Sequence, residues 1–111
     1  MTELIDRSVL DGLSEAVGED FVGELIDTFL EEAPGMFEEM KQALEKNDVD
    51  RFRRAAHSLK TNASTFGANE LAEQAKELEY MARENDLDVG NKLELLDKAY
   101  KQAADELNSL K

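Results

Sequence analysis

The side chains best suited to chemistry lie in one stretch, residues 51–69, which reads RFRRAAHSLKTNASTFGAN. None of the 26 acidic residues of the chain falls inside it, whereas four of the 13 basic residues do, together with the only histidine, His57. The stretch therefore carries a charge of +4, and the rest of the chain, with nine basic and 26 acidic residues, carries −17. Surfaces patterned for solubility mix the two signs. This segregation therefore indicates a site that meets an anion.

On a helix that turns by about 100° per residue, the apolar residues of this stretch fall in one arc about 100° wide. His57 points roughly 150° away from the centre of that arc and should face water. Its neighbours on the exposed side are basic or carry a hydroxyl: Arg53, Arg54, Lys60, Thr61 and Ser64. A neutral imidazole nitrogen is a competent nucleophile, and cations pair well with phosphoryl oxygens. The pattern predicts a cationic helical face around His57 that suits an anion, and a phosphoryl group above all.

The segment AHSLKTNASTFGA resembles the signature of the histidine-containing phosphotransfer (Hpt) domain. In that family the phosphorylated histidine is followed by a lysine three residues later and by a glycine ten residues later, which here are His57, Lys60 and Gly67. This chain departs from the pattern at Thr61, where the family usually has glycine directly after the lysine. The candidate site therefore consists of His57 as the phosphorylated residue, Lys60 as the residue that stabilises the phosphoryl group, and five binding residues: Arg53, Arg54, Thr61, Ser64 and Gly67.

The chain lacks other parts that phosphoryl transfer needs. It has no GxxxxGK loop and no kinase signature, so we expect a phosphocarrier with no autokinase activity and no cofactor or metal site of its own. A partner must supply the metal and the acidic pocket. The resemblance implies that this partner is the receiver domain of a response regulator, which brings an aspartate and a magnesium ion, and that a histidine kinase or hybrid kinase stands upstream. On this interpretation the chain is an intermediate in a two-component phosphorelay.

Two other functions stay open from the residues alone. The chain could be a helical adaptor that docks or sequesters a receiver domain while His57 stays idle, since a lone exposed histidine often has no chemical task. It could also be a plain structural bundle whose basic patch meets an acidic protein. A di-iron bundle is excluded, because it needs a Glu-x-x-His pair on two helices and the chain has one histidine.

Apolar residues recur at helical spacing along the whole chain and predict an all-α fold. The expected helices span residues 8–17, 20–33, roughly 34–46 and about 91–110, with two more between them. One of these carries His57 and lies between Asp48 and Gly67, and the other follows Asn69 and includes residues 71–82. Asp48 and Asn69 are expected to cap the helices that follow them, and Gly67 to end the helix that carries His57. Pro34 leaves open whether 20–46 is one kinked helix or two. We expect a single domain over residues 1–111, an antiparallel up-down four-helix bundle with a short extra N-terminal helix.

The composition excludes several classes of partner. A net charge of −13 argues against nucleic acid, whose phosphates would repel the protein. No apolar run approaches the 18 or so residues of a membrane span, so we expect no membrane association. The absence of cysteine excludes disulfides and thiolate metal sites, and it fits a cytoplasmic protein. We expect a monomer.

Overall fold

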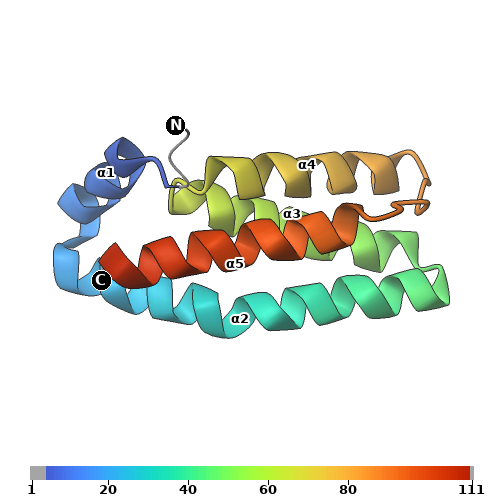
Figure 1. Ribbon diagram of the computed structural model, residues 1–111, viewed down its shortest axis with the longest axis horizontal. Helices are drawn as coiled ribbons and strands as arrows, with labels where there is room; N and C mark the ends of the chain where they lie inside the picture. The colour runs from blue at the N-terminus through green and yellow to red at the C-terminus, as the bar shows by residue number, and fades with distance from the viewer. Residues whose placement is uncertain (1–4, 111) are drawn as a thin grey trace.

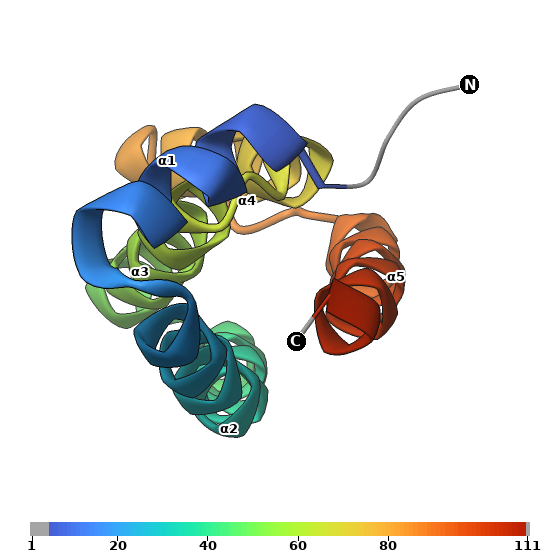
Figure 2. The ribbon, with the colours of Figure 1, turned by 90° about the vertical axis from the view of Figure 1, so that its left-hand side faces the viewer.

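The computed structural model describes residues 5–110, which form five α-helices and, within that range, no strand. The helices are α1 (Arg7–Val17), α2 (Glu19–Lys46), α3 (Val49–Thr65), α4 (Asn69–Arg83) and α5 (Lys92–Leu110). The four long helices lie side by side, each running opposite to the one before it, and α1 lies across one end of them (Figures 1 and 2). The predicted all-α fold is confirmed. None of the helices in this range has the length and apolar character that crossing a membrane requires.

The segment around Pro34 is one continuous helix, which settles the question left open by the sequence. Pro34 lies inside the 28-residue α2. Proline has no N–H, so it cannot donate to the carbonyl four residues earlier, which is that of Leu30. The hydroxyl of Tyr100, on α5, donates to this carbonyl over 3.4 Å. The neighbouring helix therefore partly replaces the hydrogen bond that the proline removes.

Both ends of α3 follow the sequence prediction, whereas the start of α4 does not. Asp48 caps the helix as expected, because its Oδ1 accepts a hydrogen bond from the Arg51 amide at 3.1 Å. Gly67 adopts a φ of 75°, a conformation open to glycine, and the chain reverses there. The prediction that Asn69 caps the next helix is wrong. The turn at Gly67 places Ala68 at the cap position, with no side-chain hydrogen bond, and Asn69 is already the first residue of α4.

The apolar arc predicted for α3 is its buried face. Its members are all buried in the core: Phe52, Ala55, Ala56, Leu59, Ala63 and Phe66. The Phe66 ring stacks on Phe29 of α2, with ring centroids 5.4 Å apart. Because α3 is held by its neighbours along this arc, the opposite face is fixed in its orientation toward solvent.

Gly67 also makes a close contact that no other residue type allows. Its carbonyl accepts a hydrogen bond from the Asp6 amide at 2.8 Å, and a Cβ at this position would lie 2.7 Å from the Asp6 carbonyl oxygen. Gly67→Ala should therefore lower the free energy of unfolding by about 1–3 kcal/mol. Urea denaturation measures this. Gly23→Ala, in the interior of α2 with open space around the added Cβ, is the control and should be neutral or stabilising. A Gly67→Ala protein as stable as the original would refute the contact.

Candidate functional site

His57 stands on the exposed face of α3, as the sequence predicts. Its side chain is 57% exposed, whereas Ala56 before it and Leu59 two residues on are fully buried. These buried neighbours fix the rotation of the helix about its axis. The imidazole is therefore exposed to solvent at the middle of α3, whose orientation is fixed by its packing.

The partner of His57 comes from the next helix. Glu79 of α4 places Oε2 2.7 Å from the imidazole Nδ1, and its side chain is only 4% exposed. Within residues 5–110, Glu79 is the single buried side chain that is polar or charged. Its position beside Leu78, on the side of α4 that faces α3, explains both its burial and its reach to His57.

Two cations share the other oxygen of Glu79. Lys60 Nζ lies 2.8 Å from Oε1, and Arg83 Nη2 lies 3.3 Å from the same atom. The Lys60 side chain is 27% exposed and that of Arg83 60% exposed. Glu79 is thus the centre of a cluster, the Glu79 cluster, that consists of His57, Lys60, Glu79 and Arg83.

The Glu79 cluster sets the tautomer of the histidine. Burial alone would raise the pKa of Glu79, but hydrogen bonds from Lys60 and His57, together with their charges, lower it below the ordinary value of 4.5. At neutral pH the group is therefore a carboxylate, which only accepts hydrogen bonds. Nδ1 must then carry the hydrogen. In the neutral ring the lone pair lies on Nε2, at the edge turned away from Glu79 and toward solvent.

The lowered pKa of Glu79 predicts how stability depends on pH. In the unfolded chain the carboxyl returns to its ordinary pKa of 4.5, so the stabilisation is fully present above that pH and is lost as the pH falls through the lower folded value. Glu79→Gln should therefore flatten the loss of stability below pH 4.5, as urea unfolding between pH 7 and pH 3 would show. Glu73→Gln, which alters an exposed carboxylate on the same helix, is the control. Parallel profiles for the protein and Glu79→Gln would show that Glu79 makes no such contribution.

The other predicted site residues divide into two groups. Arg53, Arg54, Thr61 and Ser64 lie at exposed or half-exposed positions of α3, on the helix that carries His57. Gly67 does not share this surface. It is buried in the turn after α3 and holds the backbone of Asp6, so the expectation that it forms part of the binding face is corrected to a structural role.

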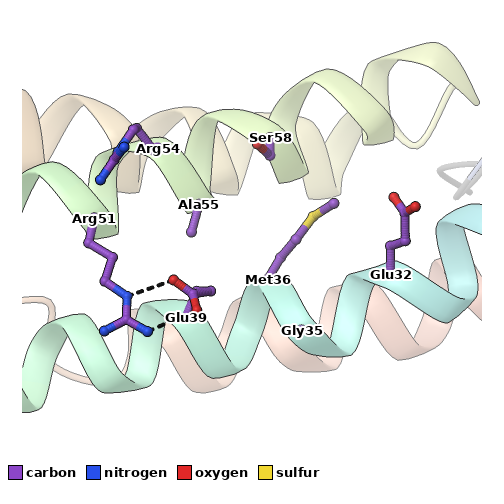
Figure 3. Close-up of a pocket in the computed structure, with 8 residues that line it drawn as sticks. All are labelled: Glu32, Gly35, Met36, Glu39, Arg51, Arg54, Ala55 and Ser58. Atoms are coloured by element: carbon purple, nitrogen blue, oxygen red, sulfur yellow. Dashed lines mark hydrogen bonds and ion pairs between the residues drawn. The ribbon is translucent and has the colours of Figure 1, made fainter.

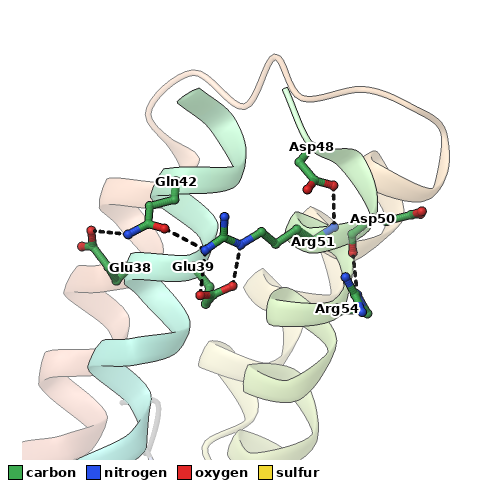
Figure 4. Close-up of polar contacts among 7 residues, drawn as sticks. All are labelled: Glu38, Glu39, Gln42, Asp48, Asp50, Arg51 and Arg54. Carbon is green, nitrogen blue, oxygen red and sulfur yellow. Dashed lines mark hydrogen bonds and ion pairs between the residues drawn. The ribbon is translucent and has the colours of Figure 1, made fainter. Parts of the chain in front are cut away.

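The basic stretch also presents less free charge than its sequence suggests. Arg51 reaches across to α2, where its Nε and Nη2 donate to the two oxygens of Glu39 over 2.6 and 2.8 Å (Figure 4). Nη2 also donates to Gln42 over 2.7 Å. Arg54 remains exposed, and its Nε donates to the carbonyl of Asp50, one turn earlier on α3 (Figure 4).

A groove of about 580 Å³ runs between α2 and α3 and reaches Ser58, the residue after His57. Met36 and Ala55 line its middle, and charged side chains stand at its ends (Figure 3). The complete lining is Glu32, Gly35, Met36, Glu39, Arg51, Arg54, Ala55 and Ser58. The exposed histidine therefore has Glu79 of α4 on one side and this groove toward α2 on the other.

Sequence reasoning missed Glu79 and Arg83. One signal was available for Glu79: it follows Leu78 directly and stands four residues after Ala75, so it falls next to the buried stripe of α4. A charged residue at such a position needs a partner. No spacing rule identifies that partner, because His57 is 22 residues away in the chain. No feature of the sequence marked Arg83 as a partner of Glu79.

Comparisons with known proteins agree on one family. The model of the Hpt domain matches residues 24–109. The phosphorelay protein LuxU of Vibrio cholerae serotype O1 is 29% identical over 110 residues, which cover 95% of this chain and 97% of LuxU. LuxU of Vibrio vulnificus is 30% identical over 84 residues, 76% of this chain and 73% of that protein. The crystal structure of histidine-containing phosphotransfer protein B from Pseudomonas aeruginosa PAO1 superposes with a TM-score of 0.90 and 29% identity, over 98% of this chain and 95% of that one.

Proposed function

Because the chain belongs to the Hpt domain family, we propose that it is a phosphorelay intermediate of two-component signalling that carries a phosphoryl group on Nε2 of His57. The group is exchanged with the aspartate of response-regulator receiver domains. The observation that carries this proposal is the exposed imidazole whose Nδ1 is held by the buried Glu79 carboxylate at 2.7 Å. That contact leaves a nucleophilic nitrogen on the surface, in a fixed direction.

The transfer can be written with balanced charges. The lone pair of Nε2 attacks the phosphorus of an aspartyl phosphate, the bond between phosphorus and the aspartate oxygen breaks, and the carboxylate leaves with the electron pair. Nδ1 keeps its hydrogen, so the phosphorylated ring becomes an imidazolium. Glu79, already bonded to Nδ1, faces the positive charge that develops on the ring. A charge placed in advance beside the reacting group lowers the barrier without reorganisation. The same steps in reverse deliver the phosphoryl group to another receiver.

Lys60 is proposed to stabilise the transferred group. Its side chain leaves α3 one turn after His57 and is partly exposed, with Nζ now on Glu79. Lys60→Ala should slow transfer from a phosphorylated receiver about tenfold, the size expected for one charge-assisted contact in the transition state. Single-turnover transfer of label measures the rate. Lys101→Ala, which removes a cation from the exposed pair with Asp97 on α5, serves as control. Equal rates for Lys60→Ala and the control would exclude this role.

The receiver is proposed to dock over the groove between α2 and α3, which adjoins His57 and combines an apolar middle with a charged rim. The described residues form no cluster of three or more His, Cys, Asp or Glu suited to a metal ion. Magnesium is proposed to come with the receiver, which also supplies the acceptor aspartate. The chain is proposed to have no autokinase activity of its own, and a kinase is proposed to load the relay. The cytoplasmic location and the monomeric state stay predictions.

The experiment that tests this function separates a carrier from an adaptor. The protein is incubated with receiver domains that bear labelled phosphate, and complex formation and label transfer are measured in the same samples. The proposal predicts label on this chain that is labile in acid and stable in base, as expected of a nitrogen–phosphorus bond. A tight complex without label on this chain would favour the adaptor.

A further inference from the structure

Two cations donate hydrogen bonds to Oε1 of Glu79, although a single cation would neutralise the charge of the carboxylate. Lys60 approaches from α3 at 2.8 Å, and Arg83 approaches along α4 at 3.3 Å. With a neutral imidazole, the Glu79 cluster carries a net charge of +1. Arg83 stands one turn after Glu79 on the same helix, as an i,i+4 neighbour, so both partners of this contact belong to α4.

Phosphorylation of His57 would give the second cation, Arg83, a specific role. A phosphoryl group brings a charge of about −2 at neutral pH, at the edge of the ring away from Glu79. Lys60 lies within one turn of that edge, and a contact with the phosphoryl oxygens draws Nζ away from Oε1. Oε1 of Glu79 then loses its short hydrogen bond, although Oε2 keeps its bond to His57. Leaving a charged acceptor without a donor costs free energy when it is buried, and the Glu79 side chain is 4% exposed. Without a replacement, Lys60 would stay on Glu79 or the carboxylate would shift and release Nδ1.

We propose that Arg83 is a positioning residue that retains Oε1 of Glu79 while Lys60 turns to the phosphoryl group. The carboxylate then stays paired, and Oε2 continues to orient the imidazole. Arg83 is 60% exposed, so it can shorten its 3.3 Å contact when Lys60 leaves. This inference rests on the proposed phosphorylation of His57.

The test compares Arg83→Gln with a matched control, Lys101→Gln. Both remove an exposed cation from an i,i+4 ion pair, and the two pairs differ in the carboxylate, which is buried in Glu79 and exposed in Asp97. Single-turnover transfer from a labelled receiver is followed at increasing receiver concentration, which gives the maximal rate and the half-saturating concentration separately. Arg83→Gln should lower the maximal rate about three- to tenfold and leave the half-saturating concentration unchanged. Lys101→Gln should change neither, and both variants should keep the thermal midpoint of the original protein.

The same substitution in a Glu79→Gln background separates positioning from direct contact. An amide needs no counter-charge, so Arg83→Gln should there slow transfer by less than about twofold relative to Glu79→Gln alone. Equal losses in both backgrounds would overturn the proposal, because Arg83 would then act on the phosphoryl group or the receiver itself. A changed half-saturating concentration, or no loss at all, would overturn it too. If the unaltered protein takes no label, the proposed function fails and this inference with it, whereas normal labelling of Arg83→Gln overturns only the role of Arg83.

Discussion

Replacing His57 with glutamine should abolish phosphoryl acceptance and leave the fold intact. The amide nitrogen of glutamine is not a nucleophile, although it can still donate a hydrogen bond to Glu79. Because the His57 side chain is 57% exposed, its replacement removes little core packing, and exposed substitutions usually change stability by less than about 0.5 kcal/mol. The measurement is incorporation of label from a phosphorylated receiver, with the circular dichroism melting curve as the check on folding.

A second variant on the same helix makes this result specific. Thr65→Ala alters an exposed residue near the end of α3, outside the groove and the Glu79 cluster, and should take up label to the same final extent as the original protein. If His57→Gln folds normally and still acquires phosphate, the phosphoryl group sits on another residue and the assignment of the site is wrong.

Leu59→Ala should produce the largest loss of stability among the variants considered. Leu59 is fully buried at the centre of the α3 face that meets the core, and truncating such a leucine costs about 2–5 kcal/mol. That is a large share of the roughly 5–15 kcal/mol that stabilises a typical domain. Urea unfolding at neutral pH measures the change.

The control for Leu59→Ala is Val17→Ala, which shortens an apolar side chain that is 41% exposed at the end of α1. It should cost well under about 1 kcal/mol. A Leu59→Ala protein that unfolds at the same urea concentration as Val17→Ala would contradict the orientation of α3. The exposure of His57 depends on that orientation, so the account of the site would fail with it.

The helix that carries His57 was predictable because all the information is local. Six apolar residues from Phe52 to Phe66 fall on one arc, so the rotation of α3 and the exposure of His57 follow from spacing alone. The Asp48 cap and the reversal at Gly67 are equally local, since each depends on one residue type at the end of the helix. The predicted cap at Asn69 failed because the cap position is set by where the Gly67 turn delivers the chain, which the sequence of α4 does not encode.

The contacts that tune the site could not be predicted, because they join different helices. The Glu79 carboxylate meets His57 only when α3 and α4 pack in one register, and periodicity gives the faces of helices but not their relative shift. The pairing of Arg51 on α3 with Glu39 on α2 could not be predicted for the same reason. It removes one cation from the supposed anion-binding face. Pro34 is a related case. Tyr100, 70 residues away from Leu30, supplies the hydrogen bond that accompanies an unbroken α2.

Onward transfer from isolated phosphorylated protein tests the relay most directly. The chain is labelled by a phosphorylated receiver, separated from it, and mixed with an unphosphorylated receiver and magnesium. The account predicts that label leaves His57 and appears on the receiver aspartate at the rate at which the chain loses it, with little release as free phosphate. It also predicts no transfer to a receiver whose acceptor aspartate is replaced by asparagine. Label that stays on the chain, or that leaves only as inorganic phosphate at the same rate with and without the receiver, would contradict a role as a relay intermediate.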